Sequence, residues 1–323
     1  MQEPLITVII PTYNYAHYIV HAIESVLSQD YPADKIEIVI VDDGSKDNTQ
    51  EVVEALRDER IRFYYQENAG KAKATAKAIQ LAKGKYIFNS DADDYFLAGK
   101  VRKTVEVFEA HPNVVHVGSP ALIVWEGEQR EKVEPIPEEI MGKVLGGEEL
   151  STYFLENNML YGGGSTYAAR AEFVKQLDIT ATVNQYIDEF LILGILPHGD
   201  AYLLNEALSV WRVHGKNYSG KRKTKEELHR KESELNASSK GTLNQLSKIE
   251  AMPKYLLQLY EFKHQMRIIS TKEKLKTKSL GDIFRFFAHF AFKNPQPLRI
   301  LKKYKAFNRL IPLFFLKLLK TGK

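Results

Sequence analysis

Four short, largely apolar segments separated by helix-like stretches dominate the first 110 residues. The apolar segments are residues 5–10, 36–41, 61–65 and 85–89. The stretches that follow them have the composition of helices, at residues 17–28, 47–57, 71–83 and 98–110. Strands that are apolar throughout, rather than at alternate positions, are buried on both faces. The pattern therefore predicts an α/β fold with a mostly parallel sheet flanked by helices.

The rest of the chain divides into two parts that differ in amino-acid composition. Within residues 114–213 we expect strands at 114–118, 120–125, 164–169, 201–204 and 208–213, and a helix at 184–197. From residue 221 the sequence becomes polar and basic, and its end is rich in Phe. We expect an α/β domain over residues 1–220 and a basic, helical C-terminal extension over 221–323.

The net charge of +4 conceals an uneven distribution. Residues 221–323 hold 25 Lys and Arg against 8 Asp and Glu, whereas residues 1–220 hold 20 against 33. The absence of cysteine excludes disulfides and thiolate metal sites, and it fits a cytoplasmic protein. The first apolar run ends at Pro11, and no run of about 18 apolar residues occurs, so neither a signal peptide nor a transmembrane helix is expected.

Polar clusters follow three of the four predicted strands. They are PTYN (11–14), DDGS (42–45) and SDADD (90–94). Because ligands bind at the carboxyl ends of strands in open α/β sheets, we expect all three clusters to line one crevice. Asp91, Asp93 and Asp94 crowd together, and such carboxylates raise one another's pKa unless a divalent cation lies between them. On spacing alone, an acidic surface turn or a helix cap remains the alternative.

Four motifs in this order resemble glycosyltransferase family 2, whose members have the GT-A nucleotide-sugar-binding fold. They are PTYN, VDDGS, ENAGKAKATAKAIQLAKGKYIFNSDADD (67–94) and LSVWRVHGKNYSG (208–220). The resemblance covers about residues 4–218 and implies a donor half over about 1–118 and an acceptor half over about 119–220. A GxGxxG fingerprint is absent, and GKAKAT lacks the upstream glycine of a Walker A loop. These absences argue against a dinucleotide enzyme and a P-loop NTPase.

The resemblance implies that the first two clusters bind the nucleoside of a UDP-sugar. Pro11, Thr12 and Tyr13 would contact the base and the ribose, and Tyr13 can stack on the base. Asp43 would accept the hydrogen bond of the uracil imide nitrogen, with Asp42 ranked second. A turn or a helix cap is the alternative role for this second cluster.

The resemblance also implies a metal and diphosphate site. Asp91 and Asp93 match the family's Asp-x-Asp motif, with Asp93 as the ligand of Mn²⁺ or Mg²⁺ and Asp91 as a ribose or metal contact. Asp94 is expected to open the next segment. In the closing WRVH segment, His214 would reach the metal or the diphosphate, and Arg212 would pair with phosphate.

One departure from the family concerns the segment after the third strand. Family members often have Arg-Asn where this chain has Thr75-Ala76. Lys73 is then the candidate cation for the diphosphate, whereas we interpret Lys71 as part of a solvated helix face.

The acceptor half carries the predicted catalytic base. In YGGGSTYAARAEF (161–173), Gly163, Gly164 and Ser165 would let the acceptor approach the backbone closely. The family's acidic pair corresponds to Asp188 and Glu189 at the start of a helix, with Asp188 as the base and Glu189 as the alternative. Ordinary acidic residues at a helix N-terminus are the structural alternative.

The implied reaction is an inverting, single-displacement transfer of sugar from a UDP-sugar to a hydroxyl of a glycan or lipid-linked acceptor. By analogy with the family, it belongs to surface polysaccharide or glycolipid synthesis. One rival is a nucleotidyltransferase, which would show a Gly- and Arg-rich N-terminal loop. Another is a non-catalytic, glycosyltransferase-like subunit that binds nucleotide or membrane.

The C-terminal extension suggests contact with an anionic membrane at the inner face of the cell membrane. Ile283, Phe286, Phe287 and Phe290 fall at i, i+3, i+4 and i+7 of a helix, and residues 298–320 mix apolar residues with Lys and Arg. Packing against the catalytic domain, or against a second subunit in a homo-oligomer, is the alternative. No nucleic-acid partner is expected, because no binding motif accompanies the basic residues.

Overall fold

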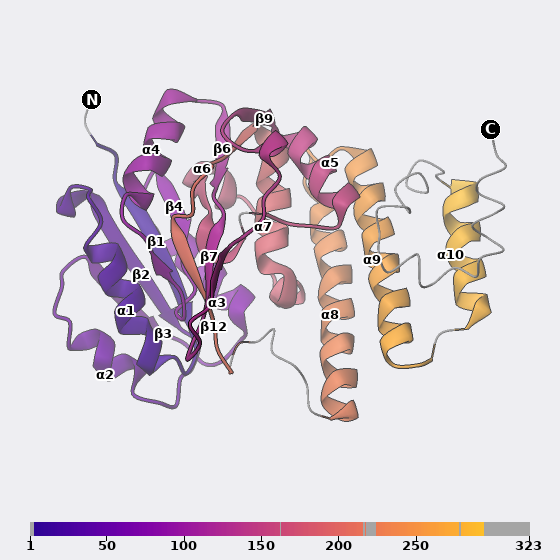
Figure 1. Cartoon of the computed structure of the whole chain (residues 1–323), viewed down its shortest axis with the longest axis horizontal. Helices are drawn as coiled ribbons and strands as arrows, with labels where there is room; N and C mark the ends of the chain where they lie inside the picture. Colours follow the sequence, from indigo (N-terminus) through magenta and orange to yellow (C-terminus); the bar gives the residue numbers. More distant parts are fainter. Residues whose placement is uncertain (1–2, 162, 216, 218–223, 278, 294–323) are drawn as a thin grey trace.

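An eight-stranded sheet forms the centre of the computed structural model, which describes residues 3–161, 163–215, 217, 224–277 and 279–293 (Figure 1). The strand order is β3-β2-β1-β4-β10-β6-β11-β9. The strands are β1 Ile6–Thr12, β2 Ile36–Asp42, β3 Ile61–Tyr65, β4 Tyr86–Asn89, β6 Val114–Gly118, β9 Val144–Gly146, β10 Ala168–Arg170 and β11 Asp200–Leu203. The first four run parallel, as predicted, and β9 and β10 are antiparallel to their neighbours.

Helices cover both faces of this sheet. They are α1 Ala16–Leu27, α2 Thr49–Glu54, α3 Lys71–Leu81, α4 Lys100–Ala110, α5 Gly147–Asn157, α6 Ala171–Val174 and α7 Ile187–Ile195. Alternate residues of β1 enter two different cores: Val8 and Ile10 pack with α1 and α4, and Ile9 packs with α3. Burial on both faces explains why the strand is apolar along its length. The α/β fold predicted from the sequence is confirmed.

A second, smaller sheet has the strand order β5-β12-β7-β8. Its strands are β5 Tyr95–Phe96, β7 Ala121–Trp125, β8 Glu131–Val133 and β12 Ser209–Val213. β5 directly follows the SDADD cluster and pairs with β12, which contains the first three residues of the WRVH segment. This sheet therefore brings two motifs that are more than 100 residues apart in the sequence to the same place.

The middle of the chain differs from the prediction in detail. Instead of a strand over 164–169, a 3-10 turn (Gly164–Thr166) precedes the short β10. Gly164 has a left-handed φ of 54°, which an extended strand does not tolerate. The predicted helix at 184–197 is divided into a 3-10 turn (η4, Ala181–Tyr186), α7 and a further 3-10 turn, Leu196–His198. Strands β8 and β9 and helix α5 lie in segments for which the sequence analysis predicted no element.

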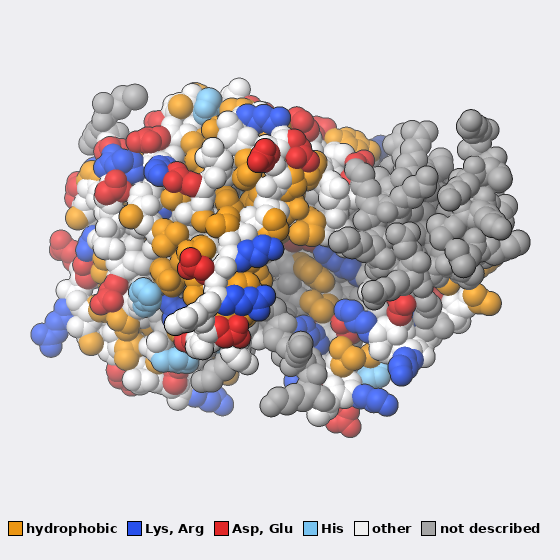
Figure 2. Space-filling view, in the orientation of Figure 1, with side chains coloured by type: hydrophobic (Ala, Val, Ile, Leu, Met, Phe, Trp, Pro, Cys, Tyr) orange, Lys and Arg blue, Asp and Glu red, His pale blue; other side chains and the backbone are white. Residues whose placement is uncertain are grey.

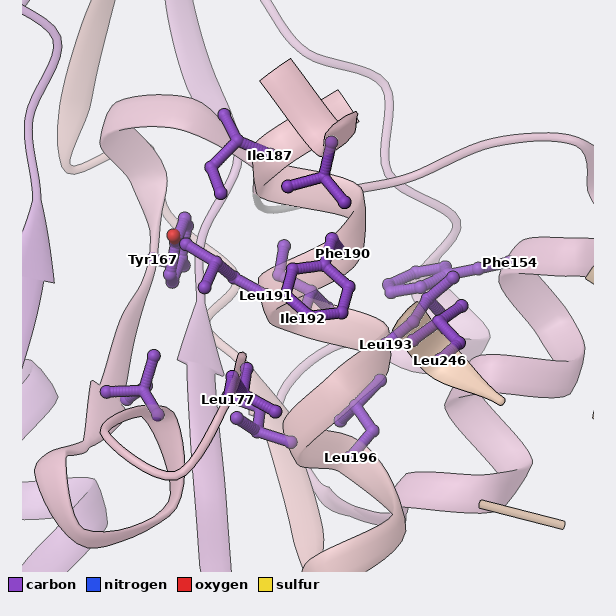
Figure 3. Close-up of a cluster of buried hydrophobic side chains, with 14 of the residues drawn as sticks. Phe154, Tyr167, Leu177, Ile187, Phe190, Leu191, Ile192, Leu193, Leu196 and Leu246 are labelled. Atoms are coloured by element: carbon purple, nitrogen blue, oxygen red, sulfur yellow. The ribbon is translucent and has the colours of Figure 1, made fainter. Parts of the chain in front are cut away.

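Three further helices follow β12 in the described part of the chain: α8 Lys225–Leu246, α9 Lys254–Lys274 and α10 Leu280–Lys293. α8 begins with a capping box in which Thr224 and Glu227 bond each other's backbone N–H. Leu246 packs in the same core as Phe154 of α5 and Leu193 of α7, as Figure 3 shows. α8 and α9 therefore share a core with the acceptor half (Figure 1).

α10 packs against α9 through part of the face predicted to meet a membrane. Ile283 and Phe286 are 6% and 5% exposed, and the rings of Phe286 and Phe262 lie 5.4 Å apart. At these two positions the prediction of a membrane-facing stripe is wrong, because both side chains are buried within the protein. The side chains of Phe287 and Phe290, and residues 298–320, lie outside the described part. Within that part, no helix is both long and apolar enough to span a membrane.

Candidate active site

The carboxyl ends of β1, β2 and β4 meet at one edge of the large sheet, as the sequence predicts. Thr12 lies opposite Asp42 in the register of β1 and β2, and Ser90 N–H donates to the Ile9 carbonyl of β1. The first two clusters also interlock. Asn14, in a left-handed conformation with φ 57°, donates its N–H to Ser45 Oγ and accepts from Lys46 N–H. The three polar clusters therefore share one site.

The two acids of DDGS have their side chains engaged with the surrounding loops. Asp42 Oδ1 accepts from Ser45 N–H at 2.8 Å and stabilises the turn. Asp43 accepts from Gln66 Nε2, Ala69 N–H and Gly70 N–H at 2.7–2.9 Å, and so holds the loop before α3. A carboxylate has about four acceptor positions, so Asp43 retains capacity for one further donor.

The residues predicted to contact the base differ in their exposure. Pro11 and Thr12 are buried, whereas the Tyr13 side chain is 42% exposed. An exposed aromatic ring next to the strand ends is available for a planar ligand. Of these three residues, Tyr13 is therefore the one positioned to stack.

Carboxylate oxygens of Asp91, Asp93 and Asp94 all lie within 4.8 Å of one another. Asp93 Oδ2 lies 3.0 Å from His214 Nε2 and 3.2 Å from Asn217 Nδ2, and both nitrogens donate to it because a carboxylate only accepts. Burial, and next the charge of Asp91, raise the pKa of Asp93. The structure thus brings the predicted metal residues Asp91 and Asp93 together.

Asp94 is the innermost of these three acids. Its Oδ2 accepts from Ser165 Oγ at 2.6 Å, and its Oδ1 accepts from Arg212 N–H at 3.0 Å. Burial, followed by the charges of Asp91 and Asp93, raises the pKa of Asp94 to about 8. Asp94 therefore connects β12 to the turn before β10, and Asp91 and Asp93 are left as the accessible ligands.

A buried lysine that the sequence analysis missed supports this arrangement. Lys100 Nζ donates to Ser165 O at 2.9 Å and to Ser209 Oγ at 2.6 Å, and burial lowers its pKa to about 7. A signal for it existed, because position 100 falls four and eight residues before the buried Thr104 and Phe108 of α4.

Lys71, interpreted from the sequence as a solvated residue, lies between two carboxylates of the site. Its Nζ is 2.8 Å from Asp91 Oδ1 and 3.9 Å from Asp188 Oδ2. Burial acts against the Lys71 charge, but Asp91 and Asp188 outweigh it and raise the lysine's pKa. Lys73 is exposed and lines a surface hollow together with Glu67 and Lys77. The structure thus favours Lys71 over the predicted Lys73 as the cation of the site.

Asp188 and Glu189 are adjacent in sequence but point to different surroundings. The Asp188 side chain is 26% exposed and faces Lys71. Burial raises the pKa of Asp188; Lys71 opposes this rise and Asp91 adds to it. Glu189 is 5% exposed and is enclosed by Tyr260, Lys263 and Arg267 of α9. Glu189 as an alternative base is therefore wrong, because its carboxylate does not face the crevice.

The glycine-rich turn lies against the acidic cluster. Gly164 O accepts from Asn89 Nδ2 at 3.0 Å, and Ser165 Oγ accepts from Asp91 N–H at 2.9 Å. A Cβ added to Gly164 would meet Asp91 Oδ2 at 3.7 Å. Gly163 precedes this turn in an extended conformation. Ser165 is 3% exposed, and its hydroxyl is engaged by Asp91 N–H and the Asp94 carboxylate, so its side chain holds the acids in place. The predicted close approach of an acceptor to the backbone of this turn stays a prediction.

Arg212 is turned toward α1. Its Nη2 lies 2.9 Å from His21 Nδ1, and its guanidinium lies over the rings of Tyr18 and Tyr95 at 4.8 and 5.2 Å. Its backbone, rather than its charge, contacts the acidic cluster through Asp94. The predicted pairing of Arg212 with phosphate would need the side chain to leave these aromatic rings.

Comparison with known families identifies the chain. The sequence profile of Glycosyl transferase family 2 matches residues 7–173, which is just over half of the 323 residues. The chain belongs to glycosyltransferase family 2. The match spans the PTYN, DDGS and SDADD clusters and ends at Phe173, before Asp188 and His214.

Curated glycosyltransferases resemble parts of this family 2 chain. The glycosyltransferase GlyG of Streptococcus pneumoniae is 45% identical over 93 residues, or 28% of this chain and 30% of GlyG. The putative teichuronic acid biosynthesis glycosyltransferase TuaG of Bacillus subtilis is 34% identical over 141 residues, or 43% of this chain and 55% of TuaG. The matches thus span between about a third and just over half of these relatives.

Solved glycosyltransferases of GT-A fold share the architecture. Residues 1–349 of S. aureus TarS superpose with a TM-score of 0.62 at 17% identity, covering 95% of this chain and 81% of that one. The mannosyltransferase PcManGT of Pyrobaculum calidifontis gives 0.57 at 20% identity, covering 94% and 85%. At these identities the likeness shows the fold, and it extends over nearly the whole chain, beyond the family 2 match.

Proposed function

We propose that this family 2 glycosyltransferase transfers a sugar from a UDP-sugar to an acceptor hydroxyl with inversion of configuration. One observation carries the proposal: Lys71 contacts both Asp91 of the acidic motif and Asp188 at the start of α7. A single lysine therefore joins the predicted diphosphate end of the donor site to the predicted base. The two halves of the chain meet where transfer would take place.

The choice of donor is supported by two kinds of observation. Tyr13 presents an exposed ring at the strand ends, and Asp43 has one acceptor position left for the N–H of a uracil. Structures of TarS with UDP-GlcNAc and with UDP show that this fold binds uridine nucleotides in that protein. PcManGT, which was solved with GDP-Man and Mn²⁺, shows that the fold also accepts other nucleotides.

The acidic cluster fits a divalent cation. Carboxylate oxygens from Asp91 and Asp93 lie within 4.8 Å of each other, and burial, followed by the charge of Asp91, raises the pKa of Asp93. We propose these two residues as the ligands of Mn²⁺ or Mg²⁺. His214 donates a hydrogen bond to Asp93 and fixes the position of its carboxylate. When bound, the cation would neutralise the charge that develops on the leaving diphosphate.

Asp188 is the proposed base. The acceptor hydroxyl oxygen forms a bond to the anomeric carbon, the bond from that carbon to the diphosphate oxygen breaks, and the hydroxyl proton passes to Asp188. Its pKa, raised first by burial, brings the carboxylate closer to the range in which a general base is effective. The positive charge of Lys71 favours the ionised form of Asp188 and can also stabilise negative charge that develops on the leaving group.

The acceptor is proposed to be a growing glycan or a lipid-linked sugar of the cell surface. The likeness to TuaG, which is described as a teichuronic acid biosynthesis enzyme, supports a polysaccharide. Attachment to the inner face of the cell membrane remains a proposal. Of the described residues, Leu280 and Phe284 of α10 are the apolar side chains it would use, at 72% and 68% exposure.

Calorimetric titration of UDP with and without MnCl₂ tests the donor site. We expect metal-dependent binding by the wild-type chain that is lost in Asp93→Asn. Asp178→Asn is the matched control, because Asp178 is a surface acid paired only with Lys248 among the described ion pairs. If folded wild-type protein binds no UDP under either condition, the uridine donor is wrong. If UDP binds, a screen of UDP-sugars for UDP release identifies the sugar.

A further inference from the structure

The first turn of α7 carries two adjacent acids that point to different sides of the helix. Successive residues of a helix are rotated by about 100° around its axis, so Asp188 and Glu189 cannot face the same way. Asp188 faces Lys71 across the crevice, and Glu189 faces α9. The direction of Asp188 is thus linked to whatever fixes Glu189.

Glu189 is held by three side chains from one face of α9. Its Oε1 accepts from Tyr260 Oη at 2.6 Å and Arg267 Nη1 at 2.9 Å. Its Oε2 accepts from Lys263 Nζ and Arg267 Nη2, each at 2.8 Å. These partners recur at i, i+3 and i+7, so one rigid helix provides all of them. The four bonds use the full acceptor capacity of the carboxylate and leave it no freedom to rotate.

Arg267 also contacts the segment on the other side of Asp188. Its guanidinium lies 4.0 Å from the centre of the Tyr186 ring, and its Nη1 donates to Ser239 Oγ of α8 at 2.9 Å. Tyr186 ends the 3-10 turn η4, and Glu189 belongs to α7. One side chain thus fixes the residues two before and one after Asp188.

We propose that Arg267 and Lys263 are positioning residues that set the place of Asp188 through Glu189 and Tyr186. α9 therefore takes part in assembling the reaction centre and is more than a covering helix. This inference rests on the role proposed for Asp188. It adds that the base is preorganised by a segment about 80 residues later in the chain, outside the residues that match the family profile.

Arg267→Met is the first test, with Lys274→Met as its matched control. Lys274 of α9 pairs with the buried Glu232 of α8 at 2.7 Å, so the control also removes an α9 ion pair, but one that does not contact α7. We expect Arg267→Met to lower kcat for UDP-sugar turnover by about 10- to 100-fold, with KM for the donor and the Kd of UDP nearly unchanged. The control is expected to stay within about twofold of wild type, because Lys274 lies outside the contacts that position Asp188.

Rescue separates positioning from general loss of structure. A cavity of about 130 Å³ borders Arg267 and Tyr186. Methylguanidinium added to Arg267→Ala is expected to enter it and recover part of kcat, and Arg267→Lys is expected to fall between wild type and Arg267→Met. Equal kcat in Arg267→Met and Lys274→Met, at equal thermal stability, would overturn the proposal.

A second measurement does not depend on turnover. Amide hydrogen exchange over residues 184–190 reports local opening of η4 and the first turn of α7. We expect faster exchange there in Arg267→Met than in Lys274→Met, with the strand ends of the donor site unchanged. Uniform exchange in both variants would contradict the proposal even if no UDP-sugar is turned over. Lack of turnover by wild type, with the exchange difference present, would instead count against the proposed function.

Discussion

Two carboxylate sites in this molecule differ in whether acids or cations are in excess. At the strand ends, Asp91, Asp93 and Asp94 lie together, and the pKa values of Asp93 and Asp94 are raised by burial and by their acidic neighbours. Beneath α9, a single Glu189 meets Lys263 and Arg267. Burial acts to raise its pKa, but Arg267 and then Lys263 outweigh burial and hold the pKa well below its usual range.

The difference separates a binding site from a structural one. A cluster in which three acids face a single lysine among the described ion pairs, as here with Lys71, is suited to a cation or a cationic transition state that arrives from solution. A carboxylate whose acceptor positions are filled by buried donors has nothing left to bind and serves to fix geometry. Around Glu189, two cations face one carboxylate. Burial lowers the pKa of one of them, Lys263. Each group can be tested by removing one charge.

The largest expected effect comes from Asp188→Asn. If Asp188 is the base, amide in place of carboxylate should lower kcat by about 10²- to 10⁴-fold, because general-base catalysis contributes about that much. UDP binding should be unchanged, since Asp188 is not among the residues proposed to bind the nucleotide or the metal. Turnover by a coupled assay for UDP release checks this. A variant that keeps full activity would favour the non-catalytic subunit instead.

The next largest effect is on stability, in Glu189→Gln. Breaking a buried ion pair by removing one partner costs about 3–5 kcal/mol, because the remaining charges stay buried without compensation. We therefore expect a clearly lower free energy of unfolding in urea for this variant. Glu234→Gln is the control, since Glu234 lies on the exposed side of α8, 3.9 Å from Arg230. A change of less than about 1 kcal/mol in Glu189→Gln would show that this cluster is exposed to water in solution.

Local sequence patterns could predict the strands and the edge where the site lies. β1 and β2 are apolar along most of their length, which already indicated burial on both faces, and the polar residues after them indicated the crevice. Asp91 and Asp93 could be predicted as a metal-binding pair because they are only two residues apart in the sequence. Lys71 was misjudged because its partner Asp188 is 117 residues away, and nothing in the helix pattern indicates that contact.

The contrast between Asp188 and Glu189 had a similar cause. Both acids stand in the first turn of α7, and the family resemblance ranked Asp188 first as the base, with Glu189 as the alternative. Their roles diverge through Tyr260, Lys263 and Arg267, which come from a segment that the sequence analysis treated as a separate extension. Tertiary contacts of this range leave no periodic signal, so the sequence could rank the two acids by resemblance but could not show that Glu189 is enclosed by α9.

His116 provides a third case, a buried ionisable group whose ring nitrogens have no hydrogen-bond partner among the described residues. It is 0% exposed, and burial lowers its pKa to about 3. The unfolded chain binds a proton below about pH 6.5, whereas the folded chain does not until about pH 3. As the pH is lowered through that window, this group should therefore decrease the free energy of unfolding by about 1.4 kcal/mol per pH unit. Urea unfolding at pH 7.5, 6.0 and 5.0 should show a flatter profile in His116→Leu, and an unchanged one in the exposed-site control His229→Gln.

The smallest expected effect has the opposite sign from that of Glu189→Gln. In metal-free protein at pH 7, the ionised form of Asp93 is disfavoured by burial and by Asp91, so its charge weakens the fold. Asp93→Asn should then raise Tm, by up to about 2–4 °C if the gain approaches 1 kcal/mol. With MnCl₂ present the order should reverse, because only the wild type gains stability from the bound ion. A lower Tm for Asp93→Asn without metal would mean that the bonds from His214 and Asn217 outweigh the repulsion, and that Asp93 resembles Glu189 more than its acidic neighbours suggest.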